Sequence, residues 1–328
     1  MRILVTGATG FVGSVVARQL LMKGHDVCAL ARPGSDKRNL KDLSIEWLEG
    51  DLRVPASLAR ACRNLDGLYH VAADYRLWSR NPQDLYDSNV AGTRNIMEAA
   101  IAGGIPRVVY TSSVATLGLT GNSQPADEDT PSSLADMVGH YKRSKYLAEQ
   151  VVQELIKRRG LPAIIVNPST PIGPFDIKPT PTGRLIKDAI ARKIPAYVDT
   201  GLNIAHVVDV AAGHVLAFEQ GQIGRRYILG GEDMSLKEIL SQIALLCGHA
   251  PPRIRLPRGL IYPVAYCAQA WAWLTDGTEP QVTIDGLRMS RKQMFFSSKR
   301  AIHELGYQTR SGREAITAAV AWFQHGDH

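Results

Sequence analysis

Cysteine and metal-binding patterns are scarce in this sequence, and their scarcity excludes several classes of protein. The 328 residues include four cysteines, and none of them forms a CxxC pair. This argues against a disulfide scaffold and predicts a reducing, cytoplasmic setting, with Cys28 as a small buried residue of a strand. The nine histidines form no HxxxH or HExxH motif, so we expect no metal site. We also expect no signal peptide, because a strand pattern begins at residue 2.

Strong net charge and long apolar runs are lacking too. The excess of Lys and Arg over Asp and Glu is 38 − 31 = +7, spread along the chain without interleaved aromatic residues, so we expect no nucleic-acid partner. The stretch 260–274, "LIYPVAYCAQAWAWL", is shorter than the roughly twenty residues that span a bilayer. Arg253, Arg255 and Arg258 precede it, so an interfacial membrane helix is one interpretation. We favour a core or pocket-lining helix.

The order of strand and helix patterns predicts an α/β fold. Strand patterns occupy residues 2–6, 26–31, 45–50, 67–72, 107–113 and 162–168, and helix patterns occupy 11–24, 82–104 and 138–160. Right-handed crossovers between such strands produce a Rossmann-type doubly wound parallel sheet. The sequence becomes rich in Pro and Gly after Pro168. We therefore predict a nucleotide-binding domain at 1–168 and a smaller, mainly substrate-binding lobe at 169–328, some of whose strands return to the main sheet.

A glycine-rich loop joins the first strand to the first helix. The segment "TGATGFVG" supplies Gly7, Gly10 and Gly13. Glycines at this place permit a tight turn, a close approach of backbone to a pyrophosphate, and close packing of the helix on the sheet. The N–H groups at the helix start then face the phosphates. The pattern predicts a dinucleotide site.

The end of the second strand, in "ALARPGS", indicates which dinucleotide binds. NAD sites carry an acid about twenty residues past the glycine loop, where it bonds the ribose 2′-hydroxyl. This strand ends in Arg32 instead, and a guanidinium there pairs with the 2′-phosphate of NADP. Ser35, Lys37 and Arg38 follow in the same loop. We predict NADP as the cofactor, with NAD as the less favoured alternative.

A tyrosine and a lysine lie four residues apart in the segment "HYKRSKYLAEQ". Tyr141 and Lys145 would share one face of the predicted helix 138–160. The ammonium group favours the tyrosine phenolate, which suits general acid–base chemistry, and it can also hold the ribose hydroxyls of the cofactor. Ser112 and Ser113 follow the fifth strand, where doubly wound sheets bind ligands. Either hydroxyl can hydrogen-bond the substrate oxygen that the tyrosine protonates.

The glycine loop, serine pair and YxxxK motif, in this order, resemble the extended short-chain dehydrogenase/reductase family over almost the whole chain. The resemblance implies a catalytic triad of Ser113, Tyr141 and Lys145. It also implies the cofactor-binding residues Gly7, Thr9, Gly10, Phe11, Val12, Gly13, Arg32, Ser35, Arg38, Asp51, Leu52, Ala72, Ala73, Asn89, Lys145, Pro168 and Ser169. His206 and Asp209 match a later motif, and we predict a structural role for them.

Within this family, "AADYRLW" and "EPQVTIDGLRMSRKQMFF" resemble the hopanoid-associated sugar epimerases, a bacterial group similar to dihydroflavonol 4-reductases. The resemblance implies an NADP-linked epimerase acting on a sugar or sugar-derived group, including one carried on a lipid. The alternatives are an NADPH-dependent ketone or aldehyde reductase and, remotely, a non-catalytic cofactor-sensing regulator. Many nucleotide-sugar enzymes carry an Arg-Asp pair where this chain has Leu202 and Asn203. Either the substrate is not a nucleotide sugar, or another residue such as Arg184 replaces that arginine.

Other substrate contacts and the assembly follow from the same resemblance. Tyr75, Arg76 and Trp78 come after the fourth strand, so we predict that they face a small-molecule substrate together with Arg184. The two long helices commonly pair across a dimer in this family. We therefore expect a homodimer.

Overall fold

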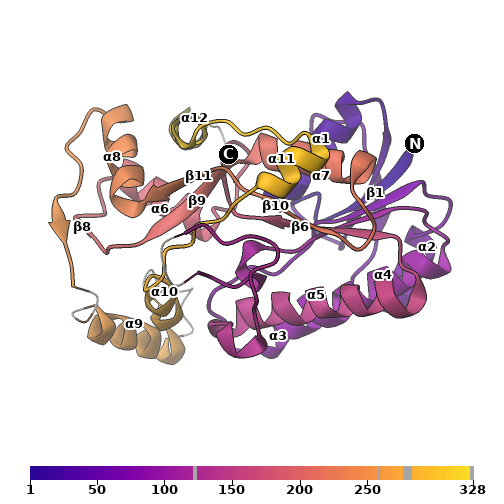
Figure 1. Cartoon of the computed structure of the whole chain (residues 1–328), viewed down its shortest axis with the longest axis horizontal. Helices are drawn as coiled ribbons and strands as arrows, with labels where there is room; N and C mark the ends of the chain where they lie inside the picture. The colour runs from indigo at the N-terminus through magenta and orange to yellow at the C-terminus, as the bar shows by residue number, and fades with distance from the viewer. Residues whose placement is uncertain (121–123, 258, 260, 276–282, 326–328) are drawn as a thin grey trace.

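The computed structural model describes residues 1–120, 124–257, 259, 261–275 and 283–325 (Figure 1). Arg258, Leu260 and residues 279–282, which belong to sequence patterns discussed above, lie outside the described residues. Every helix within the described ranges is too short or too polar to cross a membrane.

The centre of the fold is a seven-stranded parallel sheet, which confirms the predicted doubly wound α/β class. From one edge to the other, the strands are β3 (Glu46–Glu49), β2 (Asp26–Ala31), β1 (Arg2–Thr6), β4 (Gly67–His70), β5 (Val108–Thr111), β6 (Ala163–Pro168) and β10 (Arg226–Leu229). The order reverses between β1 and β4, where the connections that leave the two strands run to opposite faces of the sheet and ligands of this architecture bind. β10 belongs to the second half of the chain and pairs with β6.

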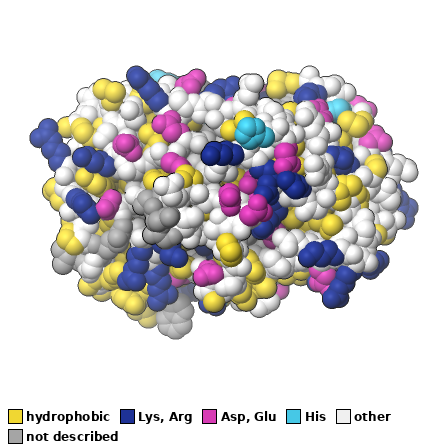
Figure 2. Space-filling model, viewed as in Figure 1, with side chains coloured by type: hydrophobic (Ala, Val, Ile, Leu, Met, Phe, Trp, Pro, Cys, Tyr) yellow, Lys and Arg dark blue, Asp and Glu magenta, His cyan; other side chains and the backbone are white. Residues whose placement is uncertain are grey.

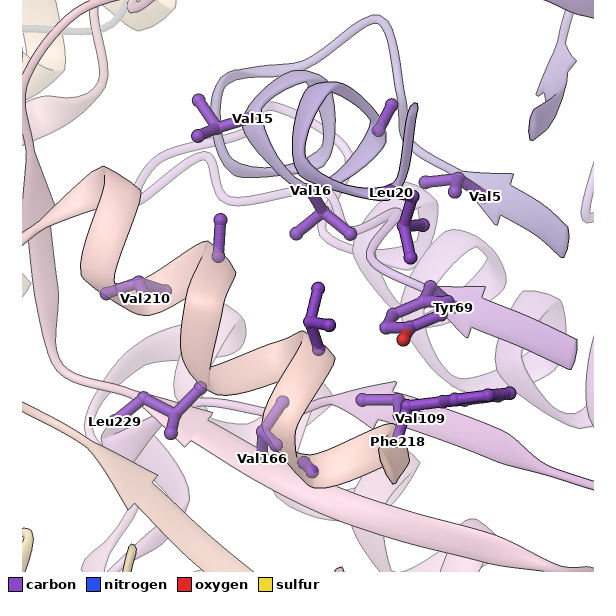
Figure 3. Packing of buried hydrophobic residues seen from close by; sticks show 14 of the residues in the cluster. Val5, Val15, Val16, Leu20, Tyr69, Val109, Val166, Val210, Phe218 and Leu229 are labelled. Atoms are coloured by element: carbon purple, nitrogen blue, oxygen red, sulfur yellow. The ribbon is translucent and has the colours of Figure 1, made fainter. Parts of the chain in front are cut away.

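Helices cover both faces of this sheet (Figure 1). One face carries α2 (Pro55–Ala61), α4 (Gly92–Ala102) and α5 (Gly139–Arg159), which close one hydrophobic core. The other face carries α1 (Phe11–Met22), α7 (Val207–Gln220) and α11 (Lys299–Leu305). Figure 3 shows Val16 and Leu20 of α1 on one side of Tyr69, and Val166 and Phe218 on the other. Each Å² of apolar surface buried in these two layers contributes about 25 cal/mol to stability. The packed helices thereby hold the ends of the strands in place.

The predicted elements of the first half agree with the structure except in one helix. The stretch 82–104 is interrupted: α3 (Gln83–Tyr86) is followed by a π-helical segment (Asp87–Ala91) before α4 begins. π-helical turns occur often at functional sites. Cys28 is buried in β2, as predicted.

The rest of the chain builds a smaller lobe beside the carboxyl ends of the sheet. A three-stranded sheet of β7 (Thr170–Ile172), β9 (Gly201–His206) and β11 (Glu232–Ser235) packs on α6 (Pro181–Ile190), α8 (Leu236–Leu246) and α12 (Gly312–His325). β8 (Ala196–Tyr197) pairs with β12 (Ile254–Arg255). His206 caps α7, since its Nδ1 accepts from the Val208 N–H, and Asp209 pairs with Arg310. Both residues thus have structural contacts.

The remaining helices, α9 (Tyr262–Leu274) and α10 (Ile284–Met289), lie together at the edge of this lobe (Figure 1). The favoured interpretation of α9 as a core or pocket-lining helix is wrong. Ala265 and Ala272 are buried, but Val264, Trp271 and Leu274 are exposed. None of the described cavity-lining residues belongs to α9. Helices α8 and α12, which carry clear apolar faces, fill the core of the lobe instead.

Candidate active site

A large cavity lies at the carboxyl ends of the strands, between the sheet and the smaller lobe. Its volume is about 1480 Å³. Pockets for one small molecule measure about 300–1,000 Å³, so this cavity has room for a cofactor and a substrate together. The predicted site residues that line it are Gly7, Thr9, Gly10, Phe11, Val12, Gly13, Arg32, Ser35, Asp51, Leu52, Ala72, Ala73, Tyr75, Arg76, Ser113, Tyr141, Lys145, Pro168, Ser169 and Arg184.

Three predicted residues are not among the described residues of the cavity wall. The Arg38 guanidinium pairs with Asp36 at 2.8 Å. Asn89 is buried in the π-helical segment, where its amide bonds the backbone of Asp74 and the hydroxyl of Ser144. Trp78 is half-buried in the loop before α3. Asn89 therefore connects the loop after β4 to α5. These two segments line the cavity, and Asn89 fixes their relative position from outside the cavity wall.

The glycine loop has the shape that a pyrophosphate requires. Gly7 has a φ of 73°, and a Cβ there would lie 2.6 Å from the Ala72 nitrogen. A Cβ on Gly13 would lie 2.1 Å from the Gly7 oxygen, so only glycine lets α1 approach β1 this closely. No side chain caps the start of α1 at Gly10. The first N–H groups of the helix thus face the cavity, ready for an anion.

The loop after β2 keeps one guanidinium available at the ribose end. The Arg32 carbonyl accepts from the Ser35 N–H at 3.1 Å, but no described hydrogen bond or ion pair holds its guanidinium. The pKa of Asp51 is lowered chiefly by its hydrogen bond with Arg53, and the charge of Arg32 adds to this. Lys37 instead lies over the Trp47 ring at 4.5 Å. Asp36 is held by Arg38, and the pKa of its carboxyl falls to about 2 chiefly through that hydrogen bond. Lys178, 3.9 Å from Asp36, adds a cation that the sequence did not indicate.

Ser113 and Tyr141 meet in the cavity. Ser113 starts a short 3-10 turn, where its hydroxyl accepts from the Ala115 N–H at 3.1 Å and its carbonyl accepts from Asn167 at 3.0 Å. Burial raises the pKa of Tyr141, and a hydrogen bond with Ser113 opposes that rise. The neutral phenol is therefore favoured at neutral pH. The sequence predicted the opposite shift from Lys145, but burial dominates here.

Lys145, on α5, contacts the end of β5. Its Nζ donates to the Thr111 carbonyl at 2.9 Å and to the Tyr110 hydroxyl at 3.5 Å. Burial lowers the pKa of Lys145 to about 8, against the opposing charge of Glu149. An ammonium with this pKa is mostly charged at neutral pH and loses its proton in mildly alkaline solution.

Glu149 is a site residue that the sequence reasoning missed. Its buried carboxylate accepts from Ser112, from Thr116 at 2.9 Å and from Asn167 at 3.0 Å. Because the Ser112 hydroxyl is used in this way, Ser113 is the serine that reaches Tyr141. The i, i+4 spacing from Tyr141 through Lys145 to Glu149 was the available signal, since it places all three on one helix face.

The part of the cavity wall that follows β6 in sequence contains a buried hydroxyl and exposed cations. Ser169 Oγ is buried in the wall, with no hydrogen-bond partner in the described part of the chain. Arg184 and Lys187 of α6 line the wall nearby in sequence. Asn203 is buried, and its amide donates to Gly231, Asp233 and Phe296. It therefore supplies no charge to a substrate.

The fold and this site define an extended short-chain dehydrogenase/reductase, and comparisons with known proteins agree. Residues 3–230 match the sequence profile of the "NAD dependent epimerase/dehydratase family". A Synechocystis protein provisionally named dihydroflavonol 4-reductase is 45% identical, covering 98% of this chain and 94% of its own. "Sterol demethylase protein B" of Methylococcus capsulatus is 34% identical, covering 99% and 98%. The crystal structure of gox2253 is 52% identical, with a TM-score of 0.89 and coverage of 99% and 98%.

The chain therefore belongs to the NAD-dependent epimerase/dehydratase family and is an NAD(P)-dependent enzyme. The match of the family profile ends at residue 230, directly after β10, the last strand of the main sheet.

Proposed function

We propose that this enzyme is an NADPH-dependent reductase of a ketone or aldehyde, with Tyr141 as proton donor. The observation that carries the proposal is the meeting of Ser113, Tyr141 and Lys145 in one cavity with the glycine loop and Arg32. The bound cofactor supplies the hydride. Tyr141 gives its phenolic proton to the carbonyl oxygen, Ser113 hydrogen-bonds that oxygen, and Lys145 stabilises the phenolate that remains.

Two observations support the direction of reduction. The raised pKa of Tyr141 keeps its proton in place until a substrate oxygen takes it. The relative that is 45% identical carries a reductase name. The hopanoid-associated sugar epimerase favoured by the sequence motifs becomes the second candidate.

The second candidate is supported by the family profile, which names epimerases. An epimerase withdraws a hydride and returns it to the other face, so Tyr141 would accept and then return one proton. In that case Arg184 and Lys187 of the cavity wall would hold the diphosphate, because Asn203 is bound to backbone carbonyls and to Asp233.

The choice of NADP over NAD rests on Arg32. Its guanidinium lies in the cavity wall, and no described carboxylate pairs with it. A 2′-phosphate would receive charge-assisted hydrogen bonds there. Asp51, after β3, pairs with Arg53 at 2.6 Å, so its negative charge is neutralised and would not repel a 2′-phosphate.

Replacing Tyr141 by Phe tests the proposed chemistry. NADPH oxidation is first followed with a panel of flavonoid, sterol-type and nucleotide-sugar ketones to find a substrate. Tyr141→Phe should then lower kcat by about 10²–10⁴-fold and leave NADPH affinity unchanged, because the proton donor is lost but the cofactor contacts remain. The matched control is Tyr146→Phe on the same helix, whose hydroxyl bonds the Ser132 carbonyl at 3.3 Å. Wild-type turnover in Tyr141→Phe would contradict the proposal.

A further inference from the structure

Helix α9 presents an uncharged apolar face to solvent. Its 13 residues, "YPVAYCAQAWAWL", contain no charged side chain. Val264, Cys267, Trp271 and Leu274 follow one another at three- and four-residue steps, which places them in one stripe. Val264 is 59% exposed, Trp271 69% and Leu274 72%. Ala265 and Ala272, on the other side of the helix, are buried.

This stripe differs from the other exposed apolar side chains. Met22, Ile223 and Leu245 are also exposed, but they belong to three separate parts of the chain. Single exposed apolar residues are normal on protein surfaces, whereas a contiguous patch usually marks an interaction site. The stripe on α9 therefore requires a partner.

Basic side chains lie on the segments next to α9. Arg288 at the end of α10, and Arg291 and Lys292 directly after it, are exposed, and α10 packs against α9. The Arg291 guanidinium lies 5.5 Å from the centre of the Tyr262 ring on α9. Figure 2 shows dark-blue side chains grouped above yellow ones at the lower left, over α10 and α9. Arg253 and Arg255, on the segment that leads to α9, are exposed as well.

The nearby acids offset only part of this charge. Asp285 pairs with Arg288 at 3.5 Å, and Asp199 pairs with Arg255 at 2.7 Å. Arg291 and Lys292 take part in no described ion pair. An exposed apolar stripe that includes a tryptophan, on a helix with unpaired cations on the neighbouring segment, has the chemistry of a helix that binds at the surface of an anionic bilayer.

We propose that α9 docks the enzyme on an anionic membrane surface. A 13-residue helix is about 20 Å long, which is too short for the roughly 30 Å hydrocarbon layer, so it lies flat. Val264, Trp271 and Leu274 enter the boundary between headgroups and acyl chains, while Arg291 and Lys292 meet the lipid phosphates.

Docking would also orient the active site. Met289, at the end of α10, and Met294 line the cavity, so its wall continues into the segment that carries Arg291 and Lys292. A lipid-borne carbonyl substrate would reach the cavity from this side. That consequence rests on the proposed function, but the docking itself does not.

Flotation with lipid vesicles tests the docking. We expect the purified enzyme to float with vesicles of equimolar phosphatidylcholine and phosphatidylglycerol, and to float less with phosphatidylcholine alone. Val264→Glu combined with Trp271→Glu should weaken partitioning by about tenfold or more, since two apolar side chains no longer leave water. Arg291→Glu with Lys292→Glu should weaken binding to the anionic vesicles by a similar factor. The matched control, Ile223→Glu with Leu245→Glu, should float like the wild type.

Sedimentation and NADPH titration complete the test. All variants should bind NADPH as the wild type does, which shows that they are folded. The proposal is overturned if the wild type does not float, or if Val264→Glu with Trp271→Glu floats equally well. Sedimentation also checks for a subunit interface. If the wild type is a dimer that does not bind vesicles, and Val264→Glu with Trp271→Glu is a monomer, the stripe is a subunit interface and the proposal is overturned. Each of these failures would leave NADPH-dependent turnover unaffected.

Discussion

At the residue scale, the chemistry depends on how burial sets the protonation of Tyr141 and Lys145. Both side chains lie at the cavity wall and both lose hydration, which favours their neutral forms. For tyrosine the neutral form is the proton donor that a reductase needs. For lysine the neutral form binds the ribose hydroxyls less strongly than the ammonium does. It also stabilises a phenolate poorly. The two residues therefore respond to alkaline pH differently.

The titration of Lys145 predicts a pH dependence of cofactor binding. The pKa of its ammonium is lowered to about 8, so the charged form that attracts NADPH is complete below this pH and is lost above it. The dissociation constant for NADPH should rise above about pH 8 by up to tenfold per pH unit. In Lys145→Arg the guanidinium stays charged, so this rise should disappear. Fluorescence titrations of both proteins across this pH range measure the effect, and a flat wild-type profile would exclude the assigned role.

At the element scale, the buried Glu149 holds together three elements that carry the site. It projects from α5, accepts from Ser112 after β5 and from Asn167 of β6, and pairs with Arg226 of β10 at 3.3 Å. The backbone of Ser113 is fixed by the same Asn167. The position of the catalytic serine therefore depends on a carboxylate outside the described cavity wall.

Removing this carboxylate should destabilise the protein strongly. Glu149→Ala leaves several buried donors and a half-buried guanidinium without their partner, which costs about 3–5 kcal/mol. Glu154→Ala, on the same helix, removes only exposed pairs with Arg94 and Arg158 and should cost less than about 1 kcal/mol. Chemical denaturation of the two variants measures the difference. Equal free energies of unfolding in the two variants would show that the hydrogen bonds of Glu149 do not stabilise the fold.

The sequence predicts elements well where one local pattern dominates. The strand β1 and the helix α1 follow from apolar periodicity and the glycine loop, and β2 ends at the residue predicted. The π-helical turn at Asp87–Ala91 was missed, because helical periodicity continues through it and Asn89 binds a distant loop. The approach of Lys178 to Asp36 joins positions far apart in the chain, which no local pattern encodes. The exposure of α9 depends on where the other helices pack.

At the scale of the whole molecule, one cavity connects the nucleotide-binding sheet to the smaller lobe. The lobe contributes α6 and the segment after α10 to the same wall that holds the glycine loop. The homodimer predicted from the sequence would form through α4 and α5, which cover the sheet face opposite α1 and α7. We propose that the assembly presents two such cavities, each next to an exposed α9.

The net charge of +7 belongs to this scale as well. A positive molecule attracts anionic cofactors and anionic surfaces over about one Debye length, roughly 8 Å at physiological salt. Local contacts then decide what binds where. Arg32 is the contact proposed to select the cofactor, and Arg291 with Lys292 are those proposed for the membrane.

Calorimetric titration of the purified enzyme with NADPH and with NADH tests the central claim most directly. We expect NADPH to bind about tenfold or more tightly than NADH, because a charge-assisted contact to the 2′-phosphate contributes about 1.5–3 kcal/mol. Arg32→Ala should lose that preference and keep its affinity for NADH. Equal affinities in the wild type, or tighter binding of NADH, would contradict the account of Arg32 and the NADP-linked function built on it.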